Sequence, residues 1–168
     1  CVCGNRWTSA PLLARYLSSL KFFAGSEPAM LLEVARVASF ESRKADEHII
    51  VQGGIAVTFH VMLEGTAWVR ISRQDESGVS RETDVTVLHV GDGFGEQGIM
   101  SEGTHVRKSS VVAREPSSVL TLRKDDYRRI IGPVHAMRVD ERLQVMTSLQ
   151  LFRGKLWTDE VLRSLSGC

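Results

Sequence analysis

The chain has 168 residues, enough for one domain of ordinary size with some additional sequence but too few for two full domains. Its 21 basic and 20 acidic residues give a formal net charge of +1 without a Lys/Arg stripe, which argues against nucleic-acid binding. No apolar stretch approaches the roughly 20 residues that a membrane span needs. The three cysteines lie at the chain ends (Cys1, Cys3 and Cys168), which argues against a disulfide framework and for a reducing, cytoplasmic location.

The first elements in chain order are helical. Apolar residues at helical spacing predict a helix over residues 9–23, which Gly25 ends. Ser26-Glu27-Pro28 combines a capping side chain with a proline in the first turn, and predicts a second helix that runs to about Ala38.

From Phe40 the pattern changes to short β-rich runs separated by glycine-rich or polar turns. We expect strands at residues 49–51, 58–63, 67–71, 85–90, 110–113 and 119–122. A short helix is expected at residues 125–131, and a longer one from Val134 to about Leu151. The predicted fold class is therefore α+β, an antiparallel β-barrel of jelly-roll type flanked by N-terminal helices and a C-terminal helical lid.

A short segment occurs twice. Ser19-Leu20-Lys21-Phe22-Phe23-Ala24-Gly25 recurs as Ser148-Leu149-Gln150-Leu151-Phe152-Arg153-Gly154. The offset has the size of a domain and indicates the start of a second, similar domain, although two unrelated helix starts would give the same match. We divide the chain into an N-terminal helical segment (residues 1–22), a main domain (23–147) and the beginning of a truncated second domain (148–168). The chain would then be a piece of a longer protein.

The residues that indicate a function lie in one segment and in an arginine that follows it. The segment is Gly91-Asp92-Gly93-Phe94-Gly95-Glu96-Gln97-Gly98-Ile99-Met100, and the arginine is Arg107. The four glycines of the segment lead into a short helical turn and expose backbone N–H groups, which predicts an anion site. Arg107 adds a planar fork of donors that matches phosphate oxygens. A carboxylate beside a phosphate is repelled, so Glu96 fits only as an acceptor for hydroxyls such as a ribose 2′-OH. This division of contacts describes a cyclic nucleotide.

The segment resembles the phosphate-binding cassette of cyclic-nucleotide-binding domains, F-G-E-x-A-L followed by P-R-A-A-[ST]-V. Upstream, Ile49-Ile50-Val51-Gln52-Gly53 and Phe59-His60-Val61-Met62-Leu63-Glu64-Gly65 are similar to the family's I-I-x-Q-G and F-x-x-x-x-x-G strands. Downstream, Leu122-Arg123-Lys124-Asp125-Asp126-Tyr127 is similar to its strand-to-helix junction. The similarity spans roughly residues 20–150 and is greatest to the first nucleotide domain of protein kinase A regulatory subunits.

The resemblance implies a set of ligand contacts. Gly95, Gln97 and Gly98 would present main-chain groups, Glu96 would bind the ribose 2′-OH, and Arg107 would bind the exocyclic phosphate oxygens. Lys108 and Ser109 would contribute backbone from the following strand. Trp157 falls within one residue of a tryptophan that stacks on the base in tandem members, so it is the candidate base cap; packing of an amphipathic helix is the alternative.

This sequence departs from the family pattern at several positions. The loop between Phe94 and Arg107 is longer by two residues, and Val106 replaces proline. Gly98 replaces alanine, and Ala56-Val57 replaces Gly-Asp. Lys108 occupies the position where alanine often accompanies cAMP and threonine cGMP, so the motif does not predict which nucleotide is preferred.

We therefore predict a regulatory module that binds cAMP or cGMP and is not an enzyme. It would have no cofactor and no metal, because the histidines lack metal spacing and no nucleophile motif occurs. Repacking of its C-terminal helices would act on a protein effector, such as a kinase catalytic subunit or another domain of the same chain. The alternative, motivated by the departures, is a degenerate fold that acts as a structural or interaction module without ligand.

Overall fold

The computed structural model describes residues 9–74, 78–100 and 105–134. The chain divides into two compact units, Cys1–Ile130 and Ile131–Cys168, and the elements below belong to the first. The long helix predicted beyond Val134, the recurring segment at residues 148–154 and Trp157 lie outside the described residues. The second domain and the helical lid therefore stay predictions.

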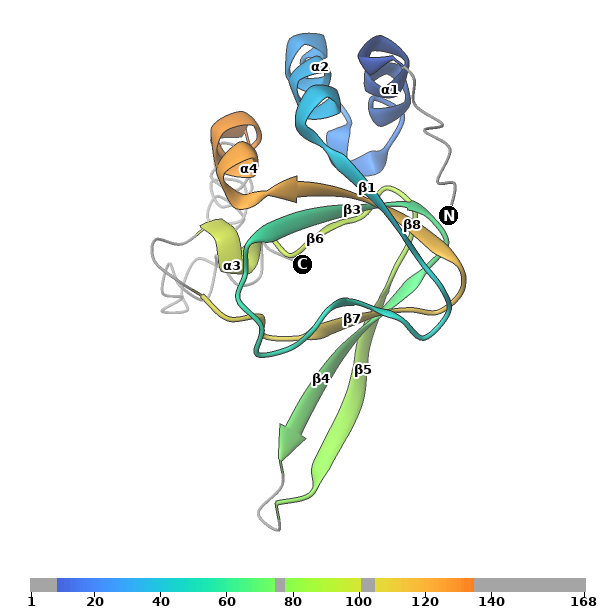
Figure 1. Ribbon diagram of the computed structural model, residues 1–168, viewed down its shortest axis with the longest axis vertical. Helices are drawn as coiled ribbons and strands as arrows, with labels where there is room; N and C mark the ends of the chain where they lie inside the picture. Colours follow the sequence, from blue (N-terminus) through green and yellow to red (C-terminus); the bar gives the residue numbers. More distant parts are fainter. Residues whose placement is uncertain (1–8, 75–77, 101–104, 135–168) are drawn as a thin grey trace, which may run out of the picture. The chain divides into compact units, whose positions relative to one another are not determined.

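The strands of the described residues form two antiparallel four-stranded sheets (Figure 1). Sheet A has the order β1-β8-β3-β6, with the bounds Ser39–Arg43, Ser117–Arg123, Thr58–Glu64 and Gly93–Phe94. Sheet B has the order β2-β7-β4-β5, with the bounds His48–Ile50, Ser110–Ala113, Ala67–Gln74 and Ser80–Leu88. The α+β class is confirmed, but the sheets do not close into the predicted barrel, because each strand pairs only within its own sheet.

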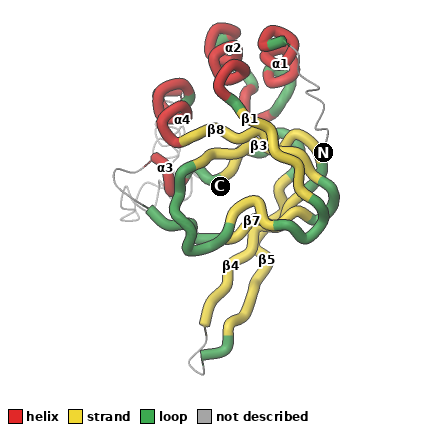
Figure 2. The backbone as a smooth tube through the Cα atoms, in the orientation of Figure 1, coloured by secondary structure: helices red, strands yellow, loops and turns green. Residues whose placement is uncertain are grey.

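Three helices lie beside sheet A, as Figures 1 and 2 show: α1 (Ala10–Leu17), α2 (Pro28–Val37) and α4 (Lys124–Ile130). The first predicted helix ends early, because a 3-10 turn at Lys21–Phe23 replaces its last part. The second begins with its proline as predicted, but its N-cap residue is Glu27 and the predicted capping hydrogen bond from a side chain is not formed. A further short helix, α3 (Gln97–Met100), follows β6.

All six predicted strands are present, but the prediction misses β1 and β6 and starts β5 too late. The missed part of β5 is polar and exposed, and it pairs along its length with β4, from Arg70 opposite Asp84 to Gln74 opposite Ser80. Backbone pairing in this hairpin does not require apolar alternation, so a pattern of hydrophobic residues could not reveal it.

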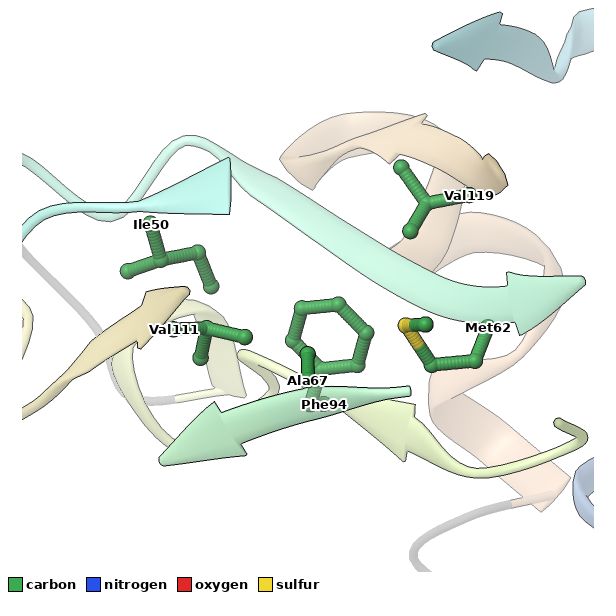
Figure 3. Packing of buried hydrophobic residues seen from close by; sticks show 6 residues of the cluster. All are labelled: Ile50, Met62, Ala67, Phe94, Val111 and Val119. Carbon is green, nitrogen blue, oxygen red and sulfur yellow. The ribbon is translucent and has the colours of Figure 1, made fainter. Parts of the chain in front are cut away.

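The core between the sheets draws equally on both of them (Figure 3). Sheet A provides Met62, Phe94 and Val119, and sheet B provides Ile50, Ala67 and Val111. Sheet A is also covered on its other face, where the ring of Phe59 lies 4.5 Å from Tyr127 of α4 and 4.9 Å from Phe22. Sheet A is therefore packed on both faces, and β6 connects it to the cassette segment.

Candidate functional site

Gly95 connects β6 to α3 and turns the chain into the cassette. Its φ of +89° is a left-handed conformation that favours glycine. A Cβ at this position would lie 2.7 Å from Arg107 Nη1, so any side chain would displace the guanidinium. Both the turn and the approach of the arginine therefore require glycine here.

Two neighbouring glycines have a packing role instead. A Cβ on Gly93 would lie 2.5 Å from the ring of Phe22, and one on Gly91 would lie 3.0 Å from the backbone nitrogen of Lys21. The N–H of Phe22 also donates to the Gly91 carbonyl at 3.0 Å. These contacts attach the 3-10 turn to the cassette, so the glycine-rich run divides into a packing part and a site part that begins at Gly95.

Arg107 is held in place through both its backbone and its side chain. Its N–H donates to the Gly54 carbonyl at 2.8 Å, and its carbonyl accepts from the Gly53 N–H at 2.9 Å. The residue is only 8% exposed. Nη1 donates to the Gly95 carbonyl at 2.7 Å, while Nη2 donates to the Thr58 carbonyl and to the Thr58 hydroxyl, the latter at 3.1 Å. The guanidinium is therefore fixed between the cassette turn and the start of β3.

Glu96 lies on the other side of Gly95. Its backbone carbonyl accepts the N–H groups of Ile99 and Met100 at 2.9 and 3.0 Å and so starts α3. Burial raises the pKa of the Glu96 carboxyl, while its own backbone N–H and the Arg107 cation act in the opposite direction. Burial lowers the pKa of the Arg107 guanidinium, and the Glu96 charge raises it. A carboxylate and a guanidinium that interact electrostatically thus flank the glycine.

The other predicted ligand residues differ in exposure. Gln97 and Lys108 are exposed, whereas Gly98 and Ser109 are half-buried. Trp157 lies outside the described residues. Ligand contacts for all five remain predictions of the sequence motif.

Two departures from the family pattern are in contact with each other. A Cβ on Gly98 would overlap the Cβ of Ala56, which is buried and held by a 2.8 Å hydrogen bond from its N–H to the His105 carbonyl. The family pattern has alanine at the first position and glycine at the second. The two departures therefore exchange one methyl group across the same contact and conserve its volume.

We expect Gly98→Ala to destabilise the fold by about 1–3 kcal/mol, because Ala56 is buried and cannot move aside. The double variant Ala56→Gly/Gly98→Ala should recover most of that loss, and denaturant unfolding of the four proteins in a double-mutant cycle measures it. Additive effects in the cycle would show that the two positions are not coupled.

The family motif gives no role to a group of polar side chains that lies behind Arg107. The Thr58 hydroxyl lies 3.0 Å from His60 Nε2, and His60 Nδ1 lies 3.0 Å from the Thr121 hydroxyl. Thr58 and His60 alternate with the apolar residues of β3, on the same face as the core residue Met62. Polar residues at core-facing positions of an apolar strand are the signal by which they could have been found.

Gln52, from the I-I-x-Q-G motif, has a structural role. Its side-chain amide donates to the Ser72 carbonyl at 2.9 Å and accepts from the Ser72 N–H at 2.8 Å. The amide thereby pairs with β4 as a neighbouring strand would. The motif glutamine fixes the hairpin of sheet B rather than the cassette.

Helix α4 contacts the cassette directly. Nε of Arg128 donates to the carbonyl of Ile99 in α3 at 2.7 Å. Tyr127 is fully buried, and burial together with the charge of Glu96 raises the pKa of its phenol. Helix α4 is therefore joined to α3 by a hydrogen bond, and its Tyr127 lies within the electrostatic influence of Glu96.

Within residues 9–74, 78–100 and 105–134, no helix is long and apolar enough to cross a membrane. The same residues contain no group of three or more His, Cys, Asp or Glu side chains that could hold a metal ion.

These features, two antiparallel sheets with a glycine turn, an adjacent carboxylate and a buried arginine, match a known class of domain. A sequence model described as the cyclic nucleotide-binding domain matches residues 40–132, more than half of the chain. The chain belongs to the cyclic-nucleotide-binding domain family, which confirms the resemblance found in its sequence.

Its curated relatives include protein kinases and a kinase regulatory subunit. The chain is 27% identical to the cGMP-dependent protein kinase egl-4 of Caenorhabditis briggsae over 76% of its length, and 30% identical to isozyme 1 of the Drosophila melanogaster cGMP-dependent protein kinase over 70%. These matches span only 17% and 15% of the two kinases. It is 33% identical to the cAMP-dependent protein kinase regulatory subunit of Yarrowia lipolytica, over 51% of this chain and 20% of that protein.

Solved structures share the fold. The regulatory domain of Toxoplasma gondii protein kinase A, crystallised with cAMP, superposes with a TM-score of 0.69 at 22% identity, over 79% of this chain and 49% of that one. The regulatory subunit of a cAMP-independent protein kinase A from Trypanosoma cruzi, bound to guanosine, gives a TM-score of 0.66 at 24% identity, over 79% and 45%. At these identities the likeness establishes the fold alone.

Proposed function

We propose that this chain is a non-catalytic regulatory domain that binds cAMP or cGMP. The observation that carries the proposal is the buried guanidinium of Arg107, whose hydrogen-bond partners among the described residues are two carbonyls and a hydroxyl. Taking a cation out of water is costly, and the Glu96 carboxylate, which interacts with Arg107 electrostatically, makes none of these hydrogen bonds. These contacts occupy at most three of its five N–H donors, which leaves at least two for the oxygens of a phosphate.

Glu96 completes the proposed ligand contacts. Its half-buried carboxylate accepts ribose hydroxyl hydrogens, while the anionic phosphate binds on the Arg107 side of Gly95. Main-chain groups of Gly95, Gln97 and Gly98 contact the ligand at the cassette turn. Following the resemblance, Lys108 and Ser109 add backbone contacts and Trp157 caps the base.

The choice of ligand is the first question for experiment. The kinase relatives are named for cGMP and the regulatory-subunit relatives for cAMP, so both nucleotides are candidates. The Trypanosoma cruzi subunit is bound to guanosine, a nucleoside without phosphate. A nucleoside would leave the two spare donors of Arg107 unused, so the geometry favours a phosphate-bearing ligand.

Isothermal titration calorimetry of the whole chain with cAMP, cGMP, adenosine and guanosine tests this proposal. Binding of at least one cyclic nucleotide, much tighter than its nucleoside, is the expected result. A 2′-deoxy analogue of the tighter nucleotide should bind more weakly if Glu96 accepts from the ribose. No heat with any of the four at high micromolar concentration would favour the ligand-free interaction module.

We further propose that ligand binding is relayed through α4. The hydrogen bond from Arg128 to the Ile99 carbonyl links α4 to α3, which begins at the proposed ribose contact. A ligand that moves α3 changes this bond, and the free energy available to shift α4 equals the ligand's differential affinity for the two positions. The effector would be a kinase catalytic subunit or another domain of a longer chain, as the kinase relatives suggest.

Arg128→Ala is expected to uncouple α4 from the cassette while nucleotide affinity changes by less than about threefold, because Arg128 contacts α3 through a backbone carbonyl. Hydrogen exchange of the α4 amides with and without nucleotide measures the coupling: protection should change in the parent and not in the variant. Arg129→Ala is the matched control, since Arg129 pairs with Glu33 and Asp126 instead. Equal responses in the two variants would contradict the relay.

A further inference from the structure

A continuous line of hydrogen-bonding side chains runs from Arg107 across the inner face of sheet A. Nη2 of Arg107 reaches the Thr58 hydroxyl, which lies 3.0 Å from His60 Nε2. His60 Nδ1 in turn lies 3.0 Å from the Thr121 hydroxyl, and this hydroxyl interacts with the carboxylate of Glu41, whose pKa it lowers. Arg107 is thereby connected to β1, the far edge of the sheet.

Strand register explains why these residues meet. Thr121 of β8 pairs directly with His60 of β3, and Ser39, two residues before Glu41, pairs with Thr121 from the other side. Residues paired across a ladder, and residues two apart along a strand, share one face of the sheet. The chain of contacts therefore follows the sheet's inner face.

The middle residues of this chain of hydrogen bonds, His60 and Thr121, are buried away from solvent. His60 is 3% exposed and Thr121 5%, and the imidazole stacks on the ring of Phe94, with 5.3 Å between centroids and 21° between planes. In such surroundings a hydroxyl or ring nitrogen left without a partner costs about 1–3 kcal/mol. The hydrogens along the line must therefore be arranged so that each donor meets an acceptor.

The two ends determine the direction of the hydrogen bonds. Arg107 can only donate, so the Thr58 oxygen accepts from it. At the other end the Glu41 carboxylate interacts with the Thr121 hydroxyl, and because a carboxylate can only accept, the hydroxyl directs its single hydrogen toward Glu41. Thr121 must then accept from His60 Nδ1–H, which leaves Nε2 of the neutral ring free to accept the Thr58 hydrogen. One tautomer satisfies all four contacts.

We infer that His60 is a positioning residue for nucleotide binding: in its neutral Nδ1–H form it takes the hydrogen of Thr58, so that the Thr58 oxygen presents a lone pair to Arg107. If Nε2 of His60 did not accept this hydrogen, the Thr58 hydroxyl would rotate and its hydrogen would point toward the guanidinium of Arg107. Glu41 anchors the line at its far end. The effect on nucleotide affinity rests on the proposed function, whereas the tautomer of His60 does not.

The tautomer is tested first, on the full chain without ligand, by long-range nitrogen–proton NMR of the His60 ring at neutral pH. A protonated Nδ1 and a bare Nε2 are expected. Thr121→Val removes the acceptor of Nδ1, and should move the proton to Nε2, where Thr58 can accept it. An Nε2–H ring in the parent chain, or a tautomer unchanged in Thr121→Val, would overturn the inference whether or not the chain binds a nucleotide.

Affinity is tested next with Thr58→Val, which keeps the shape of threonine and removes the hydroxyl. The loss of one bond to a buried cation is expected to weaken cyclic-nucleotide binding about tenfold. Thr58→Ser restores the hydroxyl and should bind within about twofold of the parent, and Thr86→Val, on the exposed strand β5, is the control for the same chemical change. Equal affinity of the Val and Ser variants at position 58 would overturn the positioning role.

Discussion

Arg107→Ala is expected to weaken cyclic-nucleotide binding by at least about 100-fold, equivalent to about 3 kcal/mol. The side chain is the buried cation of the site, and its removal also leaves the carbonyls of Gly95 and Thr58 without their donors. Calorimetric titration of parent and variant with the tighter-binding nucleotide measures the change.

Two further variants separate charge from geometry. Arg107→Lys keeps the positive charge but replaces the planar fork, whose two Nη atoms bond Gly95 and Thr58, by a single nitrogen, so we expect an affinity between those of the parent and the alanine variant. Lys108→Ala removes a neighbouring exposed cation and should change affinity by no more than a few-fold. If Arg107→Ala bound as tightly as the parent, the phosphate site would lie elsewhere.

A second large effect is expected in acid. Burial lowers the pKa of His60 from 6.5 to about 4, helped by the nearby Arg107 and Arg43 cations and opposed by Glu41. Between these values the unfolded chain holds the imidazole proton and the folded chain does not, so the free energy of unfolding decreases as the pH falls. At about 1.4 kcal/mol per pH unit, the loss attributable to His60 approaches about 3 kcal/mol.

Comparison with a variant that lacks the imidazole of His60 isolates the contribution of His60 to the free energy of unfolding. Other groups also titrate in acid: the pKa of Glu41 is lowered and that of Glu96 is raised, but both remain in His60→Gln. The difference in free energy of unfolding between parent and His60→Gln, measured by urea titration from pH 7 to 4, should therefore shrink steadily below pH 6.5. His48→Gln, at an exposed position, is the control for the same chemical change, and a constant difference for His60→Gln would refute the depressed pKa of His60.

Much of the fold can be predicted because it rests on local properties. The strands at β2, β3, β4, β7 and β8 appear as apolar runs, and α2 begins at the proline that predicts its first turn. The missed strands β1 and β6 are short or polar, and their pairing partners are distant in the sequence: Ser39 pairs with Thr121, and Phe94 with His60. No local pattern carries that information.

The same division applies to the site. The amino-acid sequence alone determines the family, the glycine turn at Gly95 and the pairing of Glu96 with Arg107, because a positive φ and a charged cassette leave a signature in neighbouring residues. Only the tertiary structure decides what holds Arg107 and why Gly98 and Ala56 change together. Those contacts depend on strand register, which brings His60 beside Thr121, 61 residues further along the chain, and on the close approach of α3 to the β2–β3 loop.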